Sequence, residues 1–109
     1  MKAVLLIGIL MGQYGCVAQN ERDQQSADRN YTECVRAAAQ TLALSTNLPA
    51  ERVAATAARS CPDYLKMVAG ARALPLGADE AAAFAENFAQ ETAKTLVADV
   101  EQARRSGRK

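Results

Sequence analysis

The chain of 109 residues carries 13 basic and 12 acidic residues, contains no histidine, and half of its residues are hydrophobic. The near balance of charge argues against a general nucleic-acid or membrane-surface binder, which would need a clear basic excess. The missing histidine excludes Ser-His-Asp and Cys-His catalysis and thiol–imidazole zinc sites. No phosphate-binding or dinucleotide-binding glycine motif is present either, so we expect a non-enzymatic protein without metal or cofactor.

Residues 1–18 are typical of a signal peptide. Lys2 supplies a positive charge, residues 3–11 form an uninterrupted apolar run, and small residues follow. The run is about half of the roughly 20 residues that a membrane-spanning helix needs. Cleavage after Ala18 would leave Gln19 as the first residue of a single-domain protein with equal numbers of acidic and basic side chains. We therefore expect a periplasmic or secreted protein with no transmembrane helix.

A second processing route is lipidation at Cys16, as in bacterial lipoproteins. Gly15 suits that route, but Gln13 and Tyr14 stand where small or aliphatic residues are expected. Cleavage after Ala18 is therefore the favoured interpretation, and a membrane-anchored lipoprotein is the alternative. Either route removes Cys16 from the thiols of the mature chain and leaves two cysteines.

The segment 19–29 holds no large apolar residue and predicts a disordered polar spacer. A single helical domain is predicted over 30–105, beginning with Asn30 as the N-cap and Glu33 completing a capping box. Its first helix should end near Leu44, because turn-forming residues follow it. The apolar stripe of this helix consists of Tyr31, Cys34, Val35, Ala38 and Leu42.

A second helix is predicted from Pro49 to Arg59. Pro62 then disfavours helical geometry at the residue before it, so a third helix should start at Pro62 and end between residues 70 and 73. Its inward-facing side chains are predicted to be Tyr64, Leu65, Val68 and Met67.

The longest predicted helix spans Ala78 to Arg105, and a basic tail occupies 106–109. Acidic residues at the start of this helix and arginines at its end suit the helix dipole. Asp99 lies at the margin of the apolar stripe, where we expect an exposed carboxylate paired with an arginine. The stripe comprises Ala81, Phe84, Ala85, Phe88, Thr92, Leu96, Val100 and Ala103.

Cys34 and Cys61 lie almost equally far before and after the turn at 45–49. Residues placed in this way lie side by side in a helical hairpin, so a disulfide between them is predicted, closing a loop of about 28 residues. An oxidising compartment outside the cytoplasm would preserve it. The expected fold is all-α: a small bundle of three to four helices, with a disulfide-stapled antiparallel helical hairpin and a long C-terminal helix.

The residues specify no biochemical activity, and a non-catalytic binding or structural module of the cell envelope is the main expectation. Phe84 and Phe88, one helical turn apart, are candidates for an interface with a protein partner or a second copy, although a core position is the more favoured interpretation. The alternative is a stress chaperone or inhibitor, because the layout of leader, about ninety helical residues and one disulfide is similar to that of small acid-activated periplasmic chaperones. An enzyme that uses carboxylates is the least favoured class.

Overall fold

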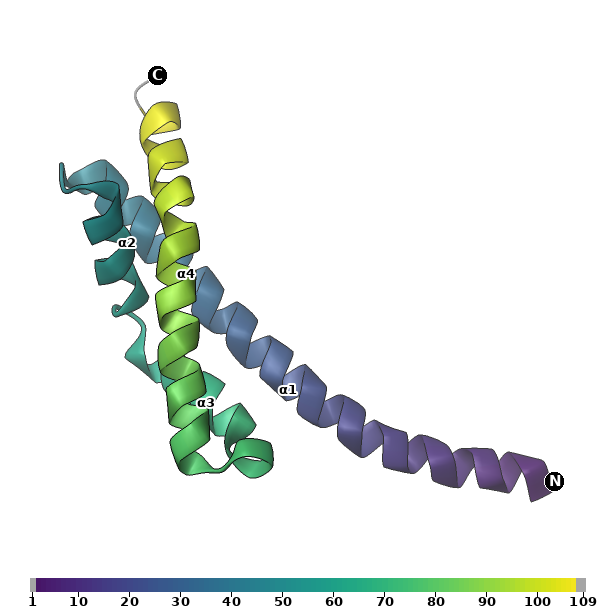
Figure 1. The fold of residues 1–109 in the computed structure, drawn as a ribbon. Helices are drawn as coiled ribbons and strands as arrows, with labels where there is room; N and C mark the ends of the chain where they lie inside the picture. Colours follow the sequence, from purple (N-terminus) through teal and green to yellow (C-terminus); the bar gives the residue numbers. More distant parts are fainter. Residues whose placement is uncertain (1, 108–109) are drawn as a thin grey trace.

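A computed structural model describes the backbone of residues 2–107 and the side chains of residues 21–107. It contains four helices, α1 (Lys2–Ser45), α2 (Ala50–Ala58), α3 (Pro62–Leu76) and α4 (Ala78–Gly107). Helices α1, α2 and α3 all contact α4, and the N-terminal part of α1 extends away from the other three (Figure 1). The prediction of an all-α bundle is confirmed.

Helix α1 differs most from the expectation, because residues 19–29 are helical instead of forming a disordered spacer. Asn30 therefore lies inside the helix and is not its N-cap. Ala27 is buried and extends the inward-facing series of Tyr31 and Val35 back by one turn. The neighbouring Asp28 pairs with Arg72 of α3. These contacts attach the predicted spacer to the bundle.

The core is formed by the apolar stripes of the helices. Leu96 and Val100 of α4 are buried together with Tyr31 and Val35 of α1 and Val53 of α2. Most of the remaining buried positions are alanines, whose small side chains let helix backbones approach closely. The fully buried core is therefore poor in large side chains. Its buried alanines are Ala27, Ala39, Ala43, Ala54, Ala57, Ala58, Ala81, Ala85 and Ala89.

Proline and glycine residues mark the boundaries between helices. Pro49 precedes α2, and Pro62 is the first residue of α3, where its missing N–H is not needed. Helix α3 continues to Leu76, past the predicted end at residues 70–73, and includes Pro75 in its last turn. Gly77 separates α3 from α4 with a φ of +87°, a conformation that side chains with a Cβ rarely adopt.

Arg104 connects the end of α4 to the end of α1. Its Nε donates to the Ala43 carbonyl at 3.0 Å, and its Nη2 donates to the Thr46 carbonyl at 3.1 Å. Carbonyls in the last turn of a helix have no partner within the helix. Arg104 therefore caps α1 from the other end of the sequence. Helix α4 continues to Gly107, and the rest of the predicted basic tail, 108–109, lies outside the described residues.

Candidate functional site

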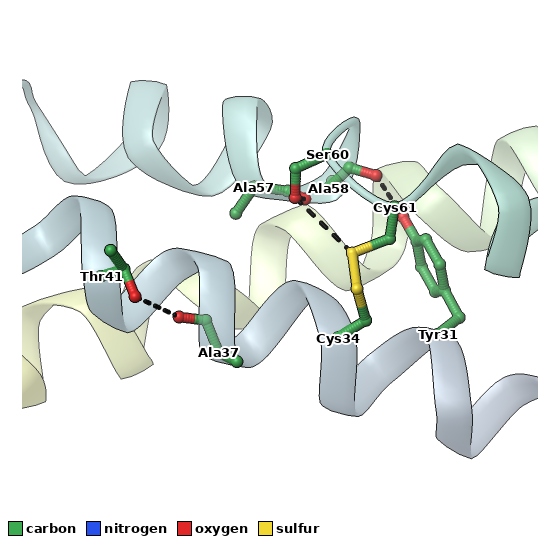
Figure 2. The surroundings of a disulfide bond; sticks show 8 residues. All are labelled: Tyr31, Cys34, Ala37, Thr41, Ala57, Ala58, Ser60 and Cys61. Carbon is green, nitrogen blue, oxygen red and sulfur yellow. Dashed lines mark hydrogen bonds between the residues drawn. A yellow bond between two sulfur atoms is a disulfide. The ribbon is translucent and has the colours of Figure 1, made fainter.

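The structure contains the predicted disulfide between Cys34 of α1 and Cys61, the residue before α3. The two Cα atoms are 6.4 Å apart, within the range that disulfides span. Next to the bridge, the Ser60 hydroxyl donates to the Ala57 carbonyl at 2.6 Å. The same hydroxyl lies 3.6 Å from the Cys61 sulfur (Figure 2). The bridge thus ties α1 to the corner between α2 and α3.

Tyr31 lies one turn before Cys34 and makes a second link between the same segments. Its hydroxyl donates a buried hydrogen bond of 2.6 Å to the Ala58 carbonyl at the end of α2 (Figure 2). Burial raises the pKa of the Tyr31 phenol above its ordinary value of 10.0; the Glu86 carboxylate raises it further and Arg59 lowers it. Tyr31 is therefore a neutral donor at physiological pH.

Arg72 of α3 joins three helices. Its guanidinium donates two hydrogen bonds, of 2.8 and 2.7 Å, to the two carboxylate oxygens of Asp28 on α1. The same guanidinium lies over the Phe84 ring of α4, 4.0 Å from the ring centroid. Only 12% of the Arg72 side chain and 26% of the Asp28 side chain are exposed. A two-pronged, largely buried pair of this kind contributes more than a surface salt bridge.

Phe84 and Phe88 pack against the core and are each partly buried. Their rings stack with centroids 6.1 Å apart, and Phe88 also contacts Tyr31 at 5.7 Å. With Arg72 covering Phe84 as well, the two rings form the aromatic part of the α1–α4 packing. The structure thus packs these two candidate interface residues against the core.

A pocket of about 280 Å³ opens between the end of α2, the start of α3 and the middle of α4. Its walls are mostly small or apolar, and Arg59 and Glu86 are the charged side chains that line it. Neither of these two has an ion-pair partner within residues 21–107. The wall residues include Ala55, Ala58, Leu65, Ala89 and Ala93.

Helix α3 carries exposed apolar side chains, two of which, Tyr64 and Met67, were predicted to face inward. Tyr64 and Met67 are 41% and 51% exposed, and Leu74 is 97% exposed. Together with the partly buried Ala71 they follow a spacing of three, four and three residues, which keeps them on one side of the helix. We call this face the α3 stripe. Met67 and Ala71 also line a hollow beside α1. The inward positions of α3 are Val68, which is buried, and Leu65, which is partly buried.

The prediction for Tyr64 and Met67 was wrong because α3 is apolar on more than one side. Its buried side is set by where α1 and α4 lie, and Arg72 shares that side to reach both helices. An apolar helix without a clear polar face does not reveal which of its sides is buried. Leu74 lies past the predicted end of this helix, so the sequence analysis assigned it to no face of the helix.

Carboxylates outside the Asp28 pair are dispersed. Asp99 pairs with Arg36 at 3.5 Å as an exposed ion pair, as expected for this position. No group of three or more potential metal ligands occurs among the described residues. Cys16, Ala18 and Gln19, the candidate processing residues, belong to the part of α1 whose side chains lie outside the described structure.

None of the helices in the described part of the chain is long and apolar enough to cross a membrane. Comparison with known proteins finds no matching family model, no matching curated protein and no matching solved structure.

Proposed function

We propose that this chain is exported, loses its leader, and acts as a non-catalytic binding or structural module of the cell envelope. In this proposal the last part of α1 and helix α2 form an antiparallel hairpin clamped by the Cys34–Cys61 bridge. The bridge supports the compartment, because disulfides persist where the surroundings are oxidising. The order of charged, apolar and small residues over 1–18 supports the leader.

The α3 stripe is the observation that carries the binding role. Tyr64, Met67 and Leu74 expose apolar surface on one side of a single helix. Contiguous exposed apolar surface on a small domain marks contact with a partner more often than apolar residues scattered singly. The framework behind the stripe is held by the Asp28–Arg72 pair and the disulfide, so the surface is presented in a fixed shape.

Site-specific photocrosslinking in intact envelopes tests this role. A photoreactive residue at position 67 should give an adduct of one defined mass, and the same residue at Glu101, exposed on α4, should not. The adduct should disappear when Leu74→Ser is added, because the partner then loses part of its contact surface. Identical adduct patterns at the two positions, or no adduct at position 67, would contradict a binding role for the stripe.

The leader is tested separately by fractionation and mass spectrometry of the mature protein. A chain that begins at Gln19 supports cleavage after Ala18. Added diacylglycerol mass on an N-terminal Cys16 would replace that cut with lipoprotein anchoring. A full-length chain retained in the cytoplasm would contradict export in either form.

A periplasmic stress chaperone or inhibitor is the second candidate, and the exposed apolar side chains of α3 favour it, because a chaperone needs apolar surface to hold a client. The test is suppression of client aggregation at about pH 2–3, where free Asp and Glu side chains are largely protonated. Absence of suppression would exclude the chaperone.

A further inference from the structure

The pocket between α2, α3 and α4 exists because its walls are built from alanines. Ala58, Ala89 and Ala93 line it where larger side chains would fill the space between the helices. Its volume of about 280 Å³ lies just below the range of roughly 300–1,000 Å³ that holds drug-sized ligands. The occupant that fits is therefore a small molecule with an apolar body.

Two opposite charges line this same small space. Arg59 and Glu86 come from different elements, and neither is engaged in an ion pair within residues 21–107. The Tyr31 hydroxyl bonds to the carbonyl of Ala58, a residue of the same pocket wall, and the two charges act in opposite directions on the pKa of its phenol. A ligand with only a carboxylate would be repelled by Glu86, and a ligand with only an ammonium group would be repelled by Arg59.

We propose that this pocket binds a small zwitterion with an apolar side chain, with its carboxylate on Arg59, its ammonium group on Glu86 and its side chain against the alanines. A free apolar amino acid and an apolar dipeptide share this chemistry. Charge complementarity selects the class, because only a ligand with both charges satisfies both unpaired side chains.

One wall of the pocket, at the end of α2, is held in place before a ligand arrives. Ala58 is held by the hydrogen bond from Tyr31, and Cys61, two residues after Arg59, is bonded to Cys34. A site whose shape is set by such contacts loses less conformational entropy on binding than a mobile one. The proposal does not depend on export or on the α3 stripe.

The experiment is a calorimetric titration of the oxidised full-length protein with three probes: leucine, leucyl-leucine and N-acetyl-leucinamide. Saturable binding of leucine or of leucyl-leucine is expected at concentrations up to the millimolar range. The probe that binds with the higher affinity shows whether the preferred ligand is a free amino acid or a peptide. N-acetyl-leucinamide has the same apolar side chain without either charge, so it should bind at least about tenfold more weakly.

Three variants test the contacts. Arg59→Gln and Glu86→Gln should each weaken binding about tenfold, and Ala93→Leu should abolish it by filling the pocket. Arg52→Gln, on the same helix as Ala55 but away from the pocket, is the matched control and should bind as the wild type does.

The two charge variants are the primary test, because Ala93→Leu also changes helix packing. Circular dichroism verifies that each variant is folded. No saturable binding of either zwitterion, equal binding of the neutral probe, or unchanged binding by both charge variants overturns the proposal.

Discussion

The Tyr31 hydroxyl donates a 2.6 Å hydrogen bond to the Ala58 carbonyl, across 27 residues of sequence and beside the Cys34–Cys61 bridge. The side chain of Tyr31 is fully buried, so its single polar atom and the carbonyl are satisfied by each other. A noncovalent link and a covalent link therefore join the same two segments of the chain.

Tyr31→Phe removes the donor and leaves the Ala58 carbonyl without this partner. We expect the free energy of unfolding to fall by about 1–2 kcal/mol, the usual cost of a buried polar group left unsatisfied. Chemical denaturation measures the change. Tyr64→Phe removes a hydroxyl from an exposed ring and should stay within about 0.5 kcal/mol of the wild type; equal losses in the two variants would show that the buried bond contributes nothing.

The same phenol predicts how stability depends on pH at the alkaline end. Its pKa in the folded protein is raised above 10.0, mainly by burial, so the folded state retains the proton after the unfolded chain has lost it. The contribution of Tyr31 is fully present below pH 10 and is lost as the pH rises through the folded-state pKa. Unfolding curves between pH 8 and 11 should show a steeper decline for the wild type than for Tyr31→Phe, which lacks the titrating group; parallel declines would contradict this.

Loss of the disulfide should destabilise the bundle strongly. Cys34→Ala with Cys61→Ala removes the constraint on a loop of about 28 residues, which chain-entropy arithmetic places at roughly 3.5 kcal/mol. That is a large part of the ~5–15 kcal/mol typical of native domains. The measurement is thermal unfolding with and without reductant. Reductant should lower the melting temperature of the wild type and leave that of the double variant unchanged.

The Asp28–Arg72 pair should matter more than the Arg36–Asp99 pair. Asp28→Ala leaves a largely buried guanidinium without its two-pronged partner, so we expect a loss of about 2–3 kcal/mol. Asp99→Ala breaks a pair that is about half exposed, and water screening limits its cost to about 0–1 kcal/mol. Denaturation midpoints of the two variants provide the comparison, and a reversed order would contradict the assignment of Asp28 as an anchor of α1.

Phe88 tests the core interpretation of the aromatic pair. Phe88→Ala should cost about 2–3 kcal/mol, less than the ~3–5 kcal/mol of a fully buried phenylalanine because its ring is only partly buried. Leu74→Ala, at a position 97% exposed, should change stability by no more than about 0.5 kcal/mol. If Phe88→Ala is equally neutral, the ring is available as an interface after all.

Helix α4 and the disulfide could be predicted from the sequence because each depends on local periodicity or on symmetry about one turn. The apolar stripe of α4 places Leu96 and Val100 in the core as expected. The extension of α1 through 19–29 could not be predicted in the same way. Its anchor is Asp28 bonded to Arg72, 44 residues away, and nothing in the polar segment itself indicates that partner.

The pocket and the α3 stripe were also missed, for a related physical reason. Both depend on which sides of neighbouring helices are left uncovered after packing. Ala93 and Met67 are ordinary helix residues in the sequence, and their exposure is decided by where the neighbouring helices lie. Arg59 and Glu86 line the same pocket only because the end of α2 lies beside the middle of α4.

Arg104, which bonds to the carbonyls of Ala43 and Thr46, makes the end of the first helix depend on the end of the last one. A chain truncated before residue 104 would keep both sulfurs of the bridge but would lose the two donors that these carbonyls use. Such a chain would be cross-linked yet frayed at residues 43–46.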